Sequence, residues 1–186
     1  MSIDKSQLLA QIGQVFSYRG YDGATLVHLA DATGLSKATL YHHFPGGKQE
    51  MAAILVRDAI SRLQQLAFQH FHTLPTEQAW PAFLQGFREY VQGGRSNCIL
   101  AVFVHQNTAH EDIADLMQQI HRQFADWHGV LADALAARGA KPKRARREAH
   151  EVMSRLYGAL MIAKLHNDAA LFDKTITRLL KQTSPT

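Results

Sequence analysis

The sequence contains little cysteine and no long apolar run, and each absence excludes a class of protein. The one cysteine, Cys98, excludes an intrachain disulfide, which is typical of a chain in a reducing cytoplasm. No stretch approaches the ~18 uninterrupted apolar residues that a membrane-spanning helix needs. The first residues also lack the basic segment and apolar run of a signal peptide. We therefore expect a cytoplasmic protein without a membrane partner.

Sequence signatures of catalysis and of metal binding are missing as well. There is no nucleophile elbow, paired-carboxylate motif or H-E-x-x-H pair. Gly46-Gly47-Lys48 resembles the end of a phosphate-binding loop, but the upstream glycine is absent and Gln49 stands where Ser or Thr is required. The eleven histidines lack the spacing of a structural zinc site. We predict neither an enzyme nor a cofactor or metal. The histidine pairs that would have to converge on a metal are His70 and His72, His105 and His110, and His121 and His128.

Positive charge is modest, and near the N-terminus it is fully offset. The 186 residues carry a formal charge of +4, which is compatible with nucleic-acid binding without requiring it. Any affinity for DNA would therefore depend on where the cations are placed. We interpret the basic run at residues 141–147 as a solvated loop and helix start rather than a second DNA contact. The charges that cancel within residues 1–50 are Lys5, Arg19, Lys37 and Lys48 against Asp4, Asp22, Asp31 and Glu50.

Apolar residues recur at helical spacing along the whole chain. The apolar run at residues 98–105 is too short to distinguish helix from strand, and we assign a helix because no partner strand is visible. Thr108 and Glu111 form a capping-box pattern before the longest periodic segment. We predict an all-α protein of about nine helices. They cover residues 4–20, 25–33, 37–44, 48–72, 76–92, 98–105, 108–138, a segment from 142 onward, and 168–181.

Residues 20–48 have the pattern of a helix-turn-helix. Thr25 is a good N-cap for a first short helix, Gly34 supplies the turn, and Ser36 caps the next helix. Pro45 and the glycines after it end that second helix. Its outward side chains are short, hydroxylated or cationic, which suits base edges and phosphates. These outward residues are Lys37, Ala38, Thr39, Tyr41, His42 and His43.

The same segment resembles the DNA-binding domain of the TetR family of bacterial transcriptional regulators. The pattern runs through Phe16, Gly20-Tyr21, Ala24-Thr25, Leu29-Ala30, Gly34-Leu35-Ser36, Thr39-Leu40-Tyr41, His43-Phe44 and Lys48. The resemblance implies a helix-turn-helix DNA-binding domain at residues 1–47 and a regulatory and dimerisation domain at residues 48–186.

The resemblance also assigns roles at the DNA. Base-contacting positions are occupied by Lys37, Ala38 and Thr39, and phosphate-contacting positions by Thr25, Tyr41, His43 and Lys48. His28 and His42 are further candidates. Lys37 would prefer O6 and N7 of guanine. Val27 departs from the family, since some members carry a longer polar or basic residue there.

The last two helices are predicted to pair with those of a second subunit. Both have wide apolar faces, and the first contains the small residues Gly158, Ala159 and Ala163, which allow another helix to approach closely. A four-helix bundle about a two-fold axis would result. TetR-like proteins dimerise in this manner, so the resemblance implies a homodimer on a double-stranded DNA operator.

The family also arranges its C-terminal helices around a ligand cavity, which implies a small apolar or aromatic effector. The chain would then be a repressor that the effector releases from a palindromic operator. An effector-independent DNA-binding protein of the same fold is the alternative, and a helical enzyme is a rival from another class. The candidate effector-contacting residues are Phe83, Phe87, Phe103, Met117, Phe124, Trp127, Met153 and Tyr157.

Overall fold

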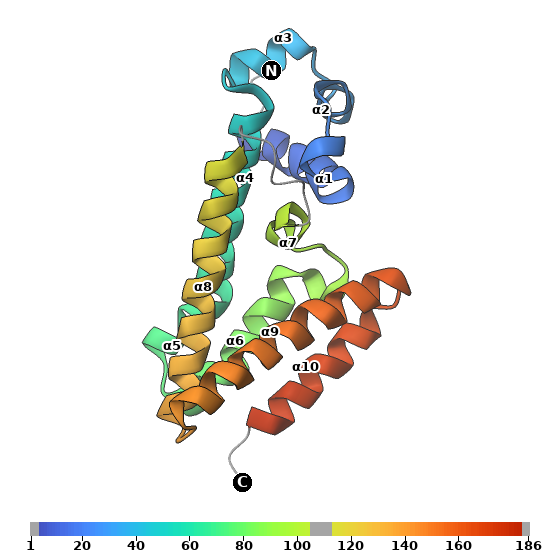
Figure 1. The fold of residues 1–186 in the computed structure, drawn as a ribbon. Coiled ribbons are helices and arrows are strands. Elements are labelled where there is room, and N and C mark those ends of the chain that lie inside the picture. Colours follow the sequence, from blue (N-terminus) through green and yellow to red (C-terminus); the bar gives the residue numbers. More distant parts are fainter. Residues whose placement is uncertain (1–3, 105–112, 184–186) are drawn as a thin grey trace. The chain divides into compact units, whose positions relative to one another are not determined.

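A computed structural model describes residues 4–104 and 113–183 of the chain, and over these residues it is helical without strands, which confirms the predicted all-α fold (Figure 1). No helix in these two ranges combines the length and apolar character needed to cross a membrane. The α-helices are α1 Lys5–Gly23, α2 Leu26–Thr33, α3 Lys37–His43, α4 Gly47–Leu63, α5 His70–Thr73, α6 Thr76–Tyr90, α7 Ile99–Val104, α8 Ala114–Ala137, α9 Pro142–Leu165 and α10 Ala169–Thr183. A π-helix, η1 Gln64–Phe68, follows α4, and a 3-10 turn, η2 Gln92–Gly94, follows α6.

Several helix boundaries differ from the predicted ones. Gly20 was expected to end the first helix, and its backbone does leave the helical conformation, with φ 68° and ψ −176°. A short helical segment resumes after this kink, so that α1 extends to Gly23. The helix predicted over residues 48–72 is divided by η1, which accounts for the additional helix. α6 begins at Thr76 as predicted, with Pro81 inside it, and ends at Tyr90. The predicted cap at Thr108 and Glu111 lies outside the described residues.

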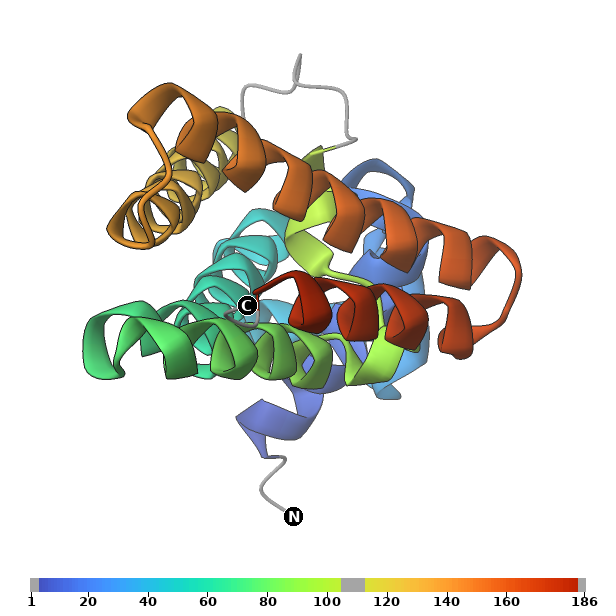
Figure 2. The same cartoon turned by 90° about the horizontal axis from the view of Figure 1, so that it is seen from below.

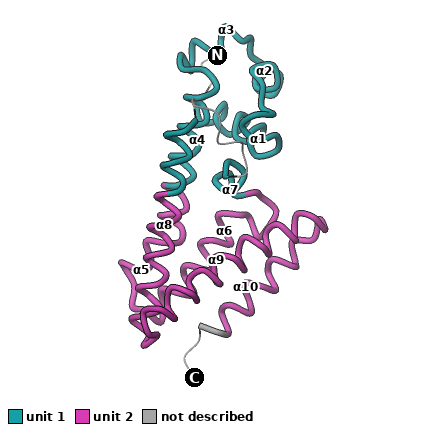
Figure 3. Tube along the Cα trace, in the orientation of Figure 1, with its two compact units in different colours: residues 1–60, 98–121 teal, residues 61–97, 122–186 magenta. Residues whose placement is uncertain are grey.

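The contacts between residues divide the chain into two compact units (Figure 3). Unit 1 comprises residues 1–60 and 98–121, and unit 2 comprises residues 61–97 and 122–186. Each unit is therefore built from two separate parts of the sequence. The domain boundary predicted at residue 47 separates a DNA-binding domain from a regulatory domain by function, whereas the two units are defined by contacts. That boundary stays a prediction.

The core of unit 1 forms where α1 packs against α2 and α7. The ring of Phe16 stacks on that of Tyr21 at 6.1 Å between centroids, and Phe103 of α7 contacts both rings at 5.7 and 6.0 Å. Leu29 of α2 and Leu40 of α3 are fully buried. This apolar packing fixes the helix-turn-helix on α1, as a support for the surface that the two short helices expose.

In unit 2, α10 packs along both α9 and α6 (Figure 2). α6 in turn packs on η1, and at Gly86 the approach is so close that a Cβ would lie 1.6 Å from the carbonyl oxygen of Leu66. The π-helical hydrogen bond runs from Gln69 N–H to the Gln64 carbonyl at 2.8 Å. Nε2 of His70 lies 3.0 Å from the Leu66 carbonyl oxygen and donates to it. The π-helix η1 is thus stabilised by the residues that pack around it.

Trp127 of α8 contacts both ends of η1. Its indole N–H donates to Oε1 of Gln64 at 2.8 Å, and its ring stacks on Phe68 at 4.7 Å and 5°. A π-helix is intrinsically less favourable than an α-helix and is common at functional sites. In this chain the tertiary contacts of Trp127 and Gly86 stabilise it.

An ion pair joins α6 to α10 and makes a pH-dependent contribution to stability. Nε of Arg88 donates to one carboxylate oxygen of Asp173 at 2.6 Å and its second nitrogen donates to the other at 3.2 Å. These hydrogen bonds lower the pKa of Asp173 below its ordinary value, with a smaller contribution from the charge itself. Because both side chains are about two-fifths exposed, at 39% and 43%, solvent screening keeps the contribution small.

Asp173→Asn is therefore expected to cost about 0.5 kcal/mol near neutral pH. A carboxylate whose pKa is lowered by folding stabilises the protein above its unfolded pKa, about 4, and loses that contribution as pH falls through the folded pKa. Urea unfolding of both proteins at several pH values checks this. The difference between them should shrink below about pH 4; a difference that grows in acid would contradict the assignment.

Candidate nucleic-acid interface

The turn between α2 and α3 is built by side-chain caps and one glycine. Gly34 takes φ 68° and ψ 17°, the left-handed conformation that a glycine adopts without strain, and its N–H donates to the carbonyls of Ala30 and Asp31. Ser36 Oγ accepts from Thr39 N–H at 3.1 Å and so caps α3. The predicted caps and turn residue are confirmed, and they hold α3 at a fixed angle to α2.

His28 has a structural role at the start of α2. Thr25 Oγ1 accepts from the N–H of His28, and Nδ1 of His28 accepts from the N–H of Thr25, both at 3.3 Å. This is a capping box with histidine in the place of Glu or Gln. Nδ1 also lies 3.0 Å from the Gly23 carbonyl oxygen, and the tautomer of the ring determines which of the two contacts is a hydrogen bond. His28 therefore orders the phosphate-binding candidate Thr25 through its ring.

The predicted DNA-contacting side chains of α3 differ in exposure. Lys37, Ala38, Tyr41 and His42 are exposed. Thr39 is half-buried, and its hydroxyl lies 2.8 Å from Ser36 Oγ. His43 is half-buried, with its ring edge-on to that of His42 at 5.8 Å. The outward face predicted from the sequence is thus present, with Thr39 and His43 recessed within it.

The turn from α3 to α4 places the Tyr41 ring against the backbone. Gly47 takes φ 62°, and a Cβ there would lie 3.1 Å from Cε1 of Tyr41. The N–H of Gly46 donates to Oε2 of Glu50 at 2.8 Å, so a carboxylate already satisfies one donor at the start of α4. Glycine at position 47 is needed both for the backbone angle and for the close approach of the ring.

Lys48 makes two contacts with Tyr21. Its ammonium group donates to the Tyr21 carbonyl at 3.0 Å and lies 4.1 Å from the centre of the Tyr21 ring. An ammonium group has three N–H donors, so one hydrogen bond leaves others for a phosphate. Lys48 thereby ties the start of α4 to the end of α1, a role that its sequence position did not indicate.

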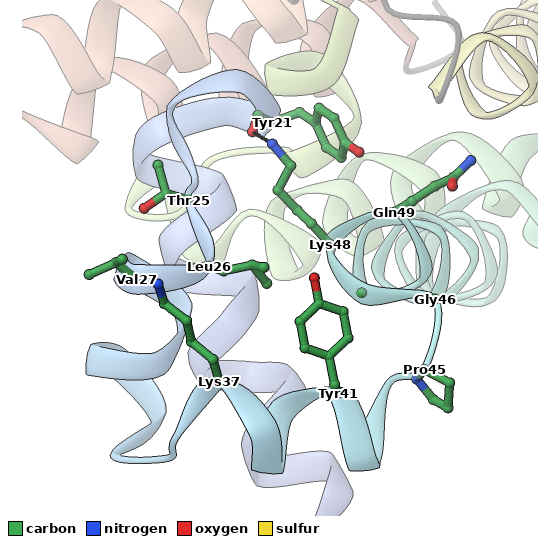
Figure 4. A pocket seen from close by; sticks show the side chains of 11 residues that line it. Tyr21, Thr25, Leu26, Val27, Lys37, Tyr41, Pro45, Gly46, Lys48 and Gln49 are labelled. Carbon is green, nitrogen blue, oxygen red and sulfur yellow. Dashed lines mark hydrogen bonds between the residues drawn. The ribbon is translucent and has the colours of Figure 1, made fainter.

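Residues of α1, α2, α3 and the start of α4 line an open hollow of about 650 Å³ in unit 1 (Figure 4). Thr25, Lys37, Tyr41 and Lys48 line it, so the structure brings together predicted contacts from α2, α3 and α4. The other predicted contacts, His28, Ala38, Thr39, His42 and His43, do not line it. The full lining, which we call the interface hollow, is Tyr21, Thr25, Leu26, Val27, Lys37, Tyr41, Pro45, Gly46, Gly47, Lys48 and Gln49.

Tyr21 and Val27 were not among the predicted contacts. Tyr21 is buried and its ring contacts the Lys48 ammonium group; the sequence signal for it was its place beside Gly20 in the family pattern. Val27 was set aside because some members of the family carry a longer polar or basic residue at this position. Its exposure of 47% could not be read from a local pattern, since it depends on how α2 packs on α1.

Most of the predicted effector-contacting residues form a continuous series of aromatic contacts in unit 2. Phe68, which was not predicted, contacts both Phe83 and Trp127, with centroids 5.0 and 4.7 Å away. From Trp127 the series continues through Phe124, Tyr157 and Phe87 at 5.5–5.6 Å per step. We call these six residues the aromatic series. Met153 is half-buried on α9.

Phe103 and Met117 belong to unit 1 and do not join that series. The described residues contain no group of three or more His, Cys, Asp or Glu side chains that could hold a metal ion. His128 stacks on His150 at 3.7 Å instead of pairing with His121. His105 and His110 lie outside the described residues.

Comparison with known proteins agrees with this architecture. Residues 8–54 match the model of bacterial regulatory proteins of the tetR family, and residues 77–177 match the C-terminal domain of LmrA/YxaF-like transcriptional regulators. The chain is 23% identical over 164 residues to the HTH-type transcriptional regulator LmrA of Bacillus subtilis, covering 86% of this chain and 85% of LmrA.

Two further similarities concern the N-terminal region and the fold. The HTH-type transcriptional repressor AcnR of Corynebacterium glutamicum is 30% identical over 66 residues, which cover 36% of this chain and 35% of AcnR. A TetR-family regulator from Agrobacterium tumefaciens has the same fold, with a TM-score of 0.75 at 18% identity over 97% of this chain and 99% of its own. The chain therefore belongs to the TetR family of DNA-binding transcriptional regulators, which are not enzymes.

Proposed function

We propose that the protein is a homodimeric repressor that binds a near-palindromic operator through the interface hollow and α3, and that a small apolar or aromatic effector releases it. The observation that carries this proposal is the convergence of Thr25, Lys37, Tyr41 and Lys48 on one open hollow. Hydroxyl and ammonium groups on one surface can donate hydrogen bonds to DNA phosphates and to the acceptor atoms on the edge of guanine. A repressor of this kind would act in the cytoplasm.

α3 would enter the major groove with Lys37 at its N-terminal end, next to a guanine. Thr25 and Tyr41 would donate to backbone phosphates on either side of that base, and Lys48 would contact a phosphate while holding Tyr21. Ala38, Thr39 and His42 would lie along the groove, and His43 beside the backbone. Phosphate contacts fix the position of the helix, whereas Lys37 supplies sequence preference.

A second copy of the chain would pack on α9 and α10. The C-terminal part of α9 exposes Met161, Ile162 and Leu165, at 61%, 46% and 75%. A Cβ at Gly158 would have no neighbour within 4 Å, so this side of α9 is open to another helix. Two such subunits would present two α3 helices to half-sites about one helical turn apart or a multiple of it.

An effector would bind beside the aromatic series. Trp80 is fully buried, and its indole N–H has no hydrogen-bond partner among the described residues, which provides a donor for a ligand acceptor. Its ring is edge-on to those of Phe71 and Phe83. The chain is helical without interruption from Gly47 through η1, so a ligand that changes the Trp127 contacts with η1 would also act on the helix that carries Lys48. Unequal binding to two conformations would release the DNA.

The effector-independent protein remains the second candidate. A thermal-shift screen with apolar and aromatic compounds separates the two, because a ligand that binds the folded state raises the melting temperature. If Trp80→Phe, which removes the indole N–H, lowers the shift from an active compound, the effector site is supported; the absence of any stabilising compound favours the second candidate.

The Lys48→Gln variant tests the DNA-binding proposal. Loss of one phosphate contact per subunit should weaken binding to every duplex and lower the slope of log Kd against log salt by about 1 per subunit. Fluorescence anisotropy at several salt concentrations measures both effects on an operator obtained by in vitro selection.

Lys143→Gln is the matched control, because it removes the same charge from an exposed position on α9. It should leave the slope unchanged. A thermal melt of Lys48→Gln should be recorded alongside, since the variant also loses the contact with Tyr21. Equal slopes for a folded Lys48→Gln and the wild type would remove Lys48 from the interface.

A further inference from the structure

Val27 is an exposed aliphatic side chain in the lining of the interface hollow. It is the second residue of α2 and is 47% exposed. It lines the interface hollow together with the ammonium groups of Lys37 and Lys48 and the hydroxyl of Thr25 (Figure 4). Lone exposed valines need no explanation elsewhere on a protein, but this one borders the groups proposed to contact DNA.

The major groove of DNA exposes one apolar group, the C5 methyl of thymine. The other bases present hydrogen-bond donors and acceptors on that edge and carry no methyl group there. An isopropyl group offers no hydrogen bond, so it would leave a guanine, cytosine or adenine edge unpaired, whereas it can pack against a methyl. Val27 therefore has the chemistry to discriminate one base by contact alone.

The position of Val27 on α2 makes such a contact geometrically consistent with the proposed binding. Thr25, the N-cap of α2, lies two residues before Val27, and both line the interface hollow with Lys37 of α3. If Thr25 contacts a phosphate and Lys37 a base, Val27 lies on the same DNA-facing surface as both. A thymine methyl projects into the major groove, where it is open to contact.

We propose that Val27 contacts the C5 methyl of a thymine in each half-site, next to the guanine contacted by Lys37. The proposal rests on the proposed DNA-binding function of the interface hollow and adds a specificity determinant from α2. It predicts that operators selected by this protein contain a thymine at a symmetric position in both halves. α2 would then contribute to sequence recognition as well as to phosphate binding.

Replacement of single thymines by deoxyuridine, which lacks only the methyl, tests the proposal on the full-length protein. The operator is first obtained by in vitro selection, and each symmetric thymine pair is then replaced in turn. At one pair, wild-type binding should weaken about fourfold per half-site, hence about fifteenfold in total, from the loss of one buried methyl. Other thymine pairs should change it little.

Val27→Ala and Val27→Thr complete the test. Val27→Ala should bind the thymine and deoxyuridine probes equally, while Val27→Thr, which keeps one methyl, should retain part of the preference. A methyl effect of unchanged size in Val27→Ala would overturn the proposal and would point instead to the exposed methyl of Ala38.

The same binding experiments separate the role of Val27 from DNA binding by the protein as a whole. Selective duplex binding without any methyl dependence overturns the role of Val27 alone. No preference for any duplex in the wild type overturns both. Because Val27 is exposed, Val27→Ala should melt at the wild-type temperature, which confirms that its binding reports on DNA contact.

Discussion

Gly86→Ala is expected to destabilise the protein by about 3 kcal/mol, at the upper end of overpacking effects. A Cβ at this position would lie 1.6 Å from the carbonyl oxygen of Leu66, 2.4 Å from its carbonyl carbon and 3.0 Å from Cα of Ala67. These are backbone atoms of η1 and cannot rotate away as a side chain would. Either α6 must separate from η1, or the π-helix must rearrange against Trp127. A change of this size should lower the melting temperature by about 10 °C.

Gly129→Ala is the matched control for this prediction. Gly129 lies within α8 of the same unit, and a Cβ there would meet nothing within 4 Å. Alanine should therefore stabilise the helix by up to about 1 kcal/mol, through its better helix propensity. Thermal and urea unfolding followed by circular dichroism compare the two variants. Equal stability of Gly86→Ala and wild type would show that α6 and η1 do not pack as closely as described.

Lys37→Ala is expected to cost the most affinity for the selected operator. A lysine that donates to O6 and N7 of guanine contributes about 1–3 kcal/mol of discrimination, and two half-sites double the effect. Binding should weaken by a factor between about 30 and 20,000, at constant salt. The preference for guanine at that position should disappear, whereas binding to unrelated duplexes should fall much less.

Lys37→Arg and Lys143→Ala control for geometry and for charge. Arginine pairs with the same guanine atoms, so Lys37→Arg should keep the base preference. Lys143→Ala removes one exposed cation from α9 and should leave it unchanged. Competition binding with operators that carry each base at the guanine position measures the preference. If Lys37→Ala kept the wild-type preference, another residue of α3 would have to read that base.

Local sequence signals determined the helix-turn-helix. Thr25 and Ser36 cap their helices, Gly34 takes the left-handed conformation, and Pro142 begins α9, all as their residue types predict. Each of these features depends on residues within one helical turn of one another. For that reason the all-α fold, and an outward face on α3, followed from the sequence and its family pattern.

Other features depend on residues far apart in the chain, and only the tertiary structure decided them. The contact of Lys48 with Tyr21 links positions 27 residues apart, and it gave a predicted phosphate ligand a second role. The packing of distant helices also determined that Val27 is exposed and that Phe103 belongs to unit 1.

The π-helix η1 is the clearest such case. Residues 64–68 fit the periodicity of a continuing α-helix, and the sequence predicted one. Contacts from Trp127 of α8 and the close approach of Gly86 of α6 stabilise the wider turn instead. Periodicity reports which side of a helix is buried, but it does not identify the surface that buries it. The sequence by itself therefore determined the helices and their caps, whereas the meeting of distant helices decided the interface hollow, the aromatic series and η1.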